Sequence, residues 1–159
     1  MCGISGIFAQ NINYHIKSDN IKKLNNALAH RGPDHEGYWT NGNEILLGHR
    51  RLSILELSTK GNQPMSSSNS RYKISYNGEI YNHFEIRKEL LNYKNVFFSS
   101  NSDTETLIEA IQHWGLKKTL SKCKGMFAFA LWDEKEKNLF LIRDRFGEKP
   151  LYYGIFNNQ

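Results

Sequence analysis

Apolar residues recur along most of the chain with the spacing of a strand or of a helix. Strand-like patterns occupy residues 2–9, 36–40, 44–49, 72–76, 96–98, 125–133, 138–144 and 151–156. The second and third patterns are joined by Asn41-Gly42, a strong signal for a β-hairpin turn. The patterns therefore predict a chain in which many strands pair in antiparallel fashion.

Three segments have the apolar spacing of an amphipathic helix. The first follows a loop over residues 11–17, begins at Ser18 and ends before Gly32-Pro33, which cannot continue a helix. The second begins at Asn82, and the third begins with a capping box over residues 102–105. Because the helices interrupt the strands without regular β–α alternation, we predict an α+β fold with antiparallel sheets and helices packed outside.

The chain has the length and composition of one globular domain. It has 159 residues, of which 39% are hydrophobic and 23% are charged. The net charge of +5 comes from basic residues scattered among acidic ones, so no nucleic-acid partner is expected. No apolar run approaches the roughly 20 residues of a membrane span, and no basic region precedes the apolar start of the chain as in a secretory signal. We therefore expect no membrane partner and a cytoplasmic location.

Neither the cysteines nor the histidines indicate a metal site. Cys2 and Cys123 are interpreted as reduced thiols because the chain shows no secretory signal, and Cys123 is expected to be a small core residue. The six histidines show no zinc spacing, and His49 and His83 are expected at the surface or in loops. No metal ligand is therefore predicted.

Cys2 is chemically distinctive because it directly follows the initiator methionine. Removal of Met1 would place a thiol with a pKa of ~8.5 and an α-amine with a pKa of ~7.7–8.0 on one carbon atom. Proton transfer from sulfur to nitrogen then costs about 1 kcal/mol or less, which makes a nucleophile with its own general base. The simpler explanation is a small residue at the start of a buried strand, and Met-Cys alone would favour it.

Six further motifs follow Met1-Cys2-Gly3-Ile4 in order and with compatible gaps. They occupy residues 30–34 (HRGPD), 51–54 (RLSI), 77–82 (NGEIYN), 102–105 (SDTE), 125–130 (GMFAFA) and 143–153 (RDRFGEKPLYY). Together they resemble the glutamine-hydrolysing domain of asparagine synthetases, a class II glutamine amidotransferase of the N-terminal nucleophile family. The resemblance covers nearly the whole chain. It implies an αββα sandwich of two antiparallel sheets, which is compatible with the fold predicted above.

The resemblance also implies the catalytic groups. Cys2 would form a γ-glutamyl thioester while its freed α-amine carries the proton. The Asn77 side-chain amide and the Gly78 backbone N–H would hold the oxygen that becomes negative. Without the other motifs, Asn77-Gly78 would predict a hairpin turn, as Asn41-Gly42 does.

The amino-acid end of glutamine needs groups of opposite charge. The resemblance assigns the substrate α-carboxylate to Arg51 and the α-ammonium to Asp103, with Glu79 assisting. From the residues alone, Arg51 could be a surface arginine and Asp103 a first-turn residue favoured by the helix dipole. The glutamine-binding residues that the resemblance implies are Arg51, Leu52, Ser53, Ile54, Leu55, Asn77, Gly78, Glu79 and Asp103.

Members of the family join this domain to a larger synthetase domain that uses ATP and Mg²⁺. No Ser-Gly-Gly phosphate loop occurs in this sequence, so no cofactor is expected here and a synthetase domain is the expected partner. Residues 1–159 are interpreted as one amidotransferase domain that lacks its last strand or strands. The unprotected strand edge expected near residues 151–156 would favour association, including a homodimer.

The leading functional hypothesis is hydrolysis of L-glutamine to glutamate and ammonia, with the ammonia used to convert aspartate to asparagine. A first alternative keeps this chemistry but delivers ammonia to another carboxylate, such as a sugar acid. A second is a non-catalytic remnant that binds glutamine or a synthetase partner. The presence of Cys2, Arg51, Asn77, Gly78 and Asp103 favours a working site.

Overall fold

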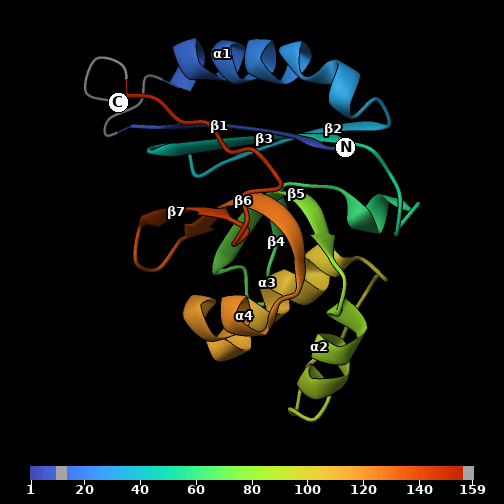
Figure 1. Cartoon of the computed structure of the whole chain (residues 1–159). Coiled ribbons are helices and arrows are strands. Elements are labelled where there is room, and N and C mark those ends of the chain that lie inside the picture. Colours follow the sequence, from blue (N-terminus) through green and yellow to red (C-terminus); the bar gives the residue numbers. More distant parts are fainter. Residues whose placement is uncertain (10–13, 156–159) are drawn as a thin grey trace.

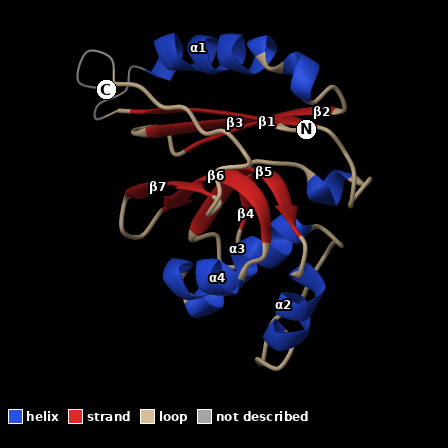
Figure 2. Ribbon diagram, viewed as in Figure 1, coloured by secondary structure: helices blue, strands red, loops and turns tan. Residues whose placement is uncertain are grey.

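The computed structural model describes residues 1–9 and 14–155, with the backbone alone for residues 14–18. Two β-sheets are stacked face to face, and helices cover the outer face of each sheet (Figure 1). The helices are α1 (Tyr14–Ala27) on one side, and α2 (His83–Leu90), α3 (Asp103–Trp114) and α4 (Leu116–Lys122) on the other. Strands therefore form the two inner layers and helices the two outer ones (Figure 2), which confirms the predicted αββα fold.

The first sheet has three antiparallel strands in the order β1-β3-β2. They are β1 (Gly3–Phe8), β2 (His35–Thr40) and β3 (Ile45–Arg51). The predicted hairpin turn lies between β2 and β3, and Gly42 has a positive φ of 83° there. In the other pair, Gly3 lies opposite Arg50, so the start of the chain lies beside the end of β3.

The second sheet has four antiparallel strands in the order β4-β5-β6-β7. They are β4 (Met65–Ser66), β5 (Tyr72–Ile80), β6 (Gly125–Asp133) and β7 (Asn138–Arg143). Strand β5 extends beyond the predicted residues 72–76, and its ladder with β6 includes the pairs Asn77–Ala128 and Gly78–Phe127. The second Asn-Gly pair of the sequence therefore lies inside a strand and not in a turn.

The two faces of β5 pack against different layers. On one face, its buried apolar residues pack with α3 in the main core; they are Tyr72, Ile74, Tyr76 and Ile80. On the other face, the Ser75 hydroxyl donates to the Gly48 carbonyl at 2.8 Å, which links the second sheet to the first. Odd-numbered residues of β5, including Asn77, therefore face the sheet that carries the N-terminus.

His49 also joins the two sheets and is not at the surface as expected. Its side chain is fully buried, and its Nε2 atom lies 3.0 Å from the Tyr76 carbonyl oxygen. Burial lowers the pKa of His49 to about 4, so the ring is neutral at physiological pH. His83, predicted in the same way, is buried as well. Both predictions from polarity alone were wrong.

The first helix and one predicted strand differ from the local sequence patterns. Helix α1 begins at Tyr14, about one turn before Ser18, and residues 14–17 contain no Gly or Pro that would stop it. The rest of the predicted loop, residues 11–13, lies outside the described residues. Residues 96–98 form no strand: Val96 is buried and Phe97 is 80% exposed, but the described chain offers them no strand partner.

The C-terminal segment also departs from its prediction. Residues 151–155 are not a strand, and the strand edge expected to favour association is absent from them. Tyr152 and Tyr153 are both exposed there. Residue 156 lies outside the described part of the chain. Among the described helices, none combines the length and apolar character needed to cross a membrane.

The loop after β7 is organised by the buried carboxylate of Asp144. Asp144 accepts hydrogen bonds from four backbone N–H groups, those of Phe127, Phe146, Glu148 and Lys149. Burial alone would raise the pKa of Asp144, but these hydrogen bonds outweigh it and lower the pKa to about 2. The stability that Asp144 provides is therefore complete above its unfolded pKa of ~3.9 and is lost as the pH falls through about 2.

We expect the free energy of unfolding, measured by urea denaturation, to fall by roughly 1–2 kcal/mol between pH 5 and pH 2 through this group. In Asp144→Asn the protein should be less stable at pH 7 and should lose less on acidification. An equal acid-induced loss in both proteins would assign the pH dependence to other carboxylates.

Candidate active site

A cavity of about 110 Å³ lies where the N-terminus, the end of β3, strand β5 and the start of α3 meet. All the predicted site residues except one line this cavity: Cys2, Arg51, Leu52, Ile54, Leu55, Asn77, Gly78, Glu79 and Asp103. The exception is Ser53, whose backbone N–H donates to Asp34 Oδ2 at 2.7 Å. Ser53 thus holds the loop in place from outside the cavity.

Cys2 is half-buried directly before β1. The Leu52 N–H lies 3.4 Å from its sulfur, and Arg31 Nε donates to its carbonyl at 3.2 Å. Burial raises the pKa of the Cys2 thiol, although the Leu52 N–H, the charged N-terminus and Arg51 act in the opposite direction. In the chain that keeps Met1, the thiol is therefore protonated at neutral pH.

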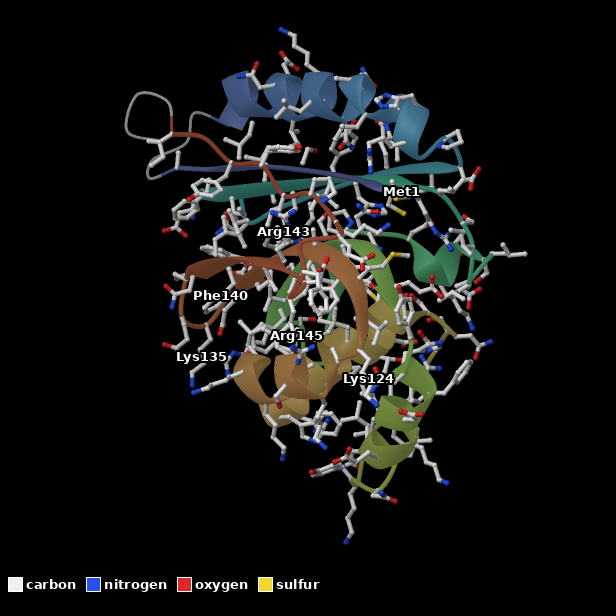
Figure 3. All side chains as sticks on the ribbon, viewed as in Figure 1. Met1, Lys124, Lys135, Phe140, Arg143 and Arg145 are labelled. Carbon is white, nitrogen blue, oxygen red and sulfur yellow. The ribbon has the colours of Figure 1, made fainter. Side chains whose placement is uncertain are left out.

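Met1 also lines the cavity. It lies at the end of the stacked sheets (Figure 3), and Lys149 Nζ is 2.8 Å from its sulfur. Lys149 is 7% exposed and Met1 is 53% exposed, so a buried lysine contacts a methionine that is partly in solvent. While Met1 is present, the nitrogen of Cys2 is an amide and cannot accept a proton.

The hydrogen-bond pattern of β5 leaves one backbone N–H directed at the cavity. The Tyr81 N–H donates to the Lys124 carbonyl, so odd-numbered residues of β5 bond to β6 and even-numbered N–H groups point away from it. The Tyr76 N–H donates to Gln63 Oε1 at 2.7 Å, and the Ile80 N–H donates to Asp103 Oδ2 at 3.0 Å. Gly78 lies between them, and its N–H has no partner among the described residues.

Gly78 has no side chain for a packing reason. A Cβ atom there would lie 2.6 Å from the Phe127 Cα atom, because β5 and β6 approach closely. The neighbouring Asn77 is 6% exposed, lines the cavity and has no side-chain hydrogen bond to any described residue. A backbone N–H and a carboxamide are thus both free to donate to a bound molecule.

The Arg51 guanidinium uses only part of its donor set on the protein. Nη1 donates to the Ser58 carbonyl and to Asn62 Oδ1, each at 2.7 Å, and Nη2 donates to the Glu56 carbonyl. A guanidinium has five N–H groups, so one on Nη2 and the one on Nε have no partner among the described residues. Both can donate to a carboxylate.

The Asp103 carboxylate also uses only one of its two oxygens in hydrogen bonds to the described residues. It is the first residue of α3, and its Oδ2 accepts from the Tyr76 hydroxyl at 2.9 Å and from the Ile80 N–H. Burial and the Asp103 charge raise the pKa of Tyr76 well above its usual value, so the phenol stays protonated and donates. The other oxygen, Oδ1, has no partner among the described residues and can accept from a cation.

The predicted set of site residues did not include several that shape the cavity. Gln63 connects β5 to α3, since its Nε2 donates to Thr104 Oγ1 at 3.3 Å while its Oε1 accepts from Tyr76. Glu56 and Lys149 also line the cavity. Glu56 follows the predicted run 51–55 directly, but nothing in its sequence context distinguishes it from a solvated loop residue. Within the described residues, no group of three or more His, Cys, Asp or Glu side chains could hold a metal ion.

Comparison with known proteins gives a consistent result. A family model described as a glutamine amidotransferase domain matches residues 1–159. The chain is 41% identical over its whole length to "Asparagine synthetase [glutamine-hydrolyzing] 1" of Bacillus subtilis, of which it covers 25%. It is 37% identical to a putative glutamine-hydrolysing asparagine synthetase 2 of Methanocaldococcus jannaschii, over 96% of this chain and 32% of that protein. The chain thus spans about a quarter to a third of these relatives.

One solved structure supports the fold assignment. The glutamine phosphoribosylpyrophosphate amidotransferase of B. subtilis, complexed with ADP and GMP, superposes with a TM-score of 0.63. It is 22% identical, over 84% of this chain and 35% of that protein. At this identity the likeness concerns the fold alone. Together, the comparisons confirm the resemblance that the motifs indicated.

Proposed function

This chain belongs to the glutamine amidotransferase domain family, and we propose that it hydrolyses L-glutamine to glutamate and ammonia with Cys2 as the nucleophile. The proposal rests on the meeting, in one cavity, of the Cys2 thiol and a Gly78 N–H that has no partner in the described part of the chain. A nucleophile beside unused N–H donors is the arrangement that acyl transfer requires.

The proposed reaction begins when removal of Met1 frees the α-amine of Cys2, which takes the thiol proton. The thiolate attacks the γ-carbonyl carbon, and the resulting negative oxygen accepts hydrogen bonds from the Asn77 carboxamide and the Gly78 N–H. As the C–N bond breaks, the α-ammonium returns its proton to nitrogen, and ammonia leaves a γ-glutamyl thioester. Water, deprotonated by the same amine, then attacks the thioester and releases glutamate and the thiol.

The remaining groups select the free amino acid. The two N–H groups of Arg51 without a partner among the described residues suit the α-carboxylate, and Asp103 Oδ1 suits the α-ammonium, while Glu79 also lines the cavity. A hydrogen bond to a charged group contributes about 1.5–3 kcal/mol, so both contacts together favour glutamine over a glutamine residue within a peptide.

For the whole protein, we propose that the ammonia converts aspartate to asparagine. The support is the names of the relatives, most of whose length lies outside the matched region. ATP and Mg²⁺ belong, in this proposal, to a synthetase domain and not to the described cavity. These names do not favour a sugar acid as acceptor.

The decisive experiment compares chains with and without Met1, verified by intact mass. We expect the processed chain to convert labelled glutamine to glutamate. A version that keeps an uncleaved extension before Cys2 should lose at least about 10²-fold in rate, because its nitrogen is an amide and no base remains. No turnover by processed, folded protein would leave the non-catalytic remnant as the better interpretation.

A further inference from the structure

The loop after β3 contributes to the lining of the cavity, and Arg51, the last residue of β3, holds this loop in place. Leu52, Ile54 and Leu55 of this loop line the cavity. Farther along, the Arg51 guanidinium binds the carbonyl groups of Ser58 and Glu56. The position of the guanidinium therefore depends on the position of the loop backbone.

Glu56 connects this loop to a second segment. Its Oε1 atom accepts from the Ser58 N–H at 2.9 Å, and its Oε2 atom accepts from the Asn101 N–H at 3.0 Å. The hydrogen bond from Asn101, followed by those from Ser58, lowers the pKa of Glu56 to about 2. The carboxylate therefore stays charged at every pH at which the enzyme would be assayed.

The segment that Glu56 reaches carries the other charged subsite. Asn101 directly precedes Ser102, whose side chain caps α3 by accepting from the Thr104 N–H. Asp103 is the first residue of that helix and projects its carboxylate into the cavity. One side chain thus joins the loop that holds Arg51 to the turn that holds Asp103.

We propose that Glu56 is a positioning residue that fixes the spacing between the free N–H groups of Arg51 and the free oxygen of Asp103. This inference rests on the proposed function. It states that Glu56 determines how tightly the site binds the α-carboxylate and α-ammonium of glutamine. Glu56 makes no contact with the reacting γ-amide in this role. Its loss should therefore weaken binding without slowing the chemical step.

Glu109, in helix α3 together with Asp103, provides a matched control for Glu56. Its carboxylate accepts from the Ser68 N–H at 2.6 Å and from the Ser68 hydroxyl at 2.8 Å, so it also ties a loop to α3. Glu109 does not line the cavity. Glu109→Gln therefore measures the general effect of loosening a loop on this helix.

The test measures steady-state kinetics and thiol labelling on processed chains. We expect Glu56→Gln and Glu56→Ala to raise KM for glutamine roughly tenfold while kcat stays within about twofold. Labelling of Cys2 by a diazoketone analogue of glutamine, which carries the α-carboxylate and α-ammonium, should slow roughly tenfold. Labelling by iodoacetamide, which lacks both groups, should not change. Glu109→Gln should leave both labelling rates and KM unchanged even if its melting temperature falls.

The outcomes separate this inference from the proposed function. An unchanged KM in both Glu56 variants of an active enzyme would overturn the role of Glu56 alone. Equal slowing of both labelling reactions would also overturn it, because the damage would then have reached the thiol. If the unsubstituted, processed chain reacts with iodoacetamide but neither turns over glutamine nor reacts with the analogue, the proposed function fails and the inference fails with it.

Discussion

Replacing Cys2 with alanine is expected to lower kcat for glutamine hydrolysis by about 10⁴-fold or more. The thiol would be the atom that bonds to substrate carbon, and no second thiol lines the cavity within the described residues. Asn77, Gly78 and Arg51 remain in the variant, so glutamine should still bind. Ammonia release and binding of glutamine, measured on the same preparation, would show the rate lost and the binding kept.

Cys123→Ala is the control for this variant. Cys123 is 1% exposed within the core between the second sheet and its helices, and burial raises the pKa of its thiol to about 11. Its replacement should cost roughly 1 kcal/mol of stability and leave kcat unchanged. If Cys2→Ala kept most of the hydrolysis rate, the assignment of Cys2 as the nucleophile would be wrong. Loss of rate in Cys123→Ala alone would also contradict this assignment, because the thiol needed for hydrolysis would then lie in the core.

Much of the fold could be predicted from local patterns because alternation reports which side of a strand is buried. The β2–β3 hairpin was predicted almost to the residue, since strand alternation and turn chemistry agree there. The same rule failed at residues 96–98 and 151–155. Val96 and Phe97 do alternate between buried and exposed, but a strand also needs a neighbour to bond to. The sequence near a segment carries no information about that neighbour.

The site shows a similar division. The site residues that the motif resemblance implied make up half of those that line the cavity, although they come from the N-terminus, β3 and the loop after it, β5 and α3. The resemblance did not reveal that two loop carbonyls and the Asn62 side chain occupy three of the Arg51 N–H groups, or that Glu56 reaches Asn101. Such contacts join residues 45 positions apart through one hydrogen bond. They depend on how the loops pack and leave no periodic signal in the chain.

Asn77→Ala is expected to lower kcat by about 10²–10³-fold with little change in KM. The carboxamide would bind the oxygen strongly only after attack, when it carries negative charge, so the loss should fall on the chemical step. Steady-state kinetics on the processed chain measures both constants. A rise in KM at constant kcat would instead place Asn77 in ground-state binding.

Asn41→Ala is the matched control because the chain contains two Asn-Gly pairs. Asn41 Oδ1 accepts from the N–H groups of Asn43, Glu44 and Ile45, so its side chain is used up in holding the hairpin turn. Its replacement should lower stability by roughly 1 kcal/mol and leave kcat unchanged. Asn77 makes no such bonds within the described residues and lies in a strand whose partner is already fixed by the backbone ladder. The same dipeptide should therefore affect stability at one position and the reaction rate at the other, because only one of the two carboxamides is free to meet a substrate.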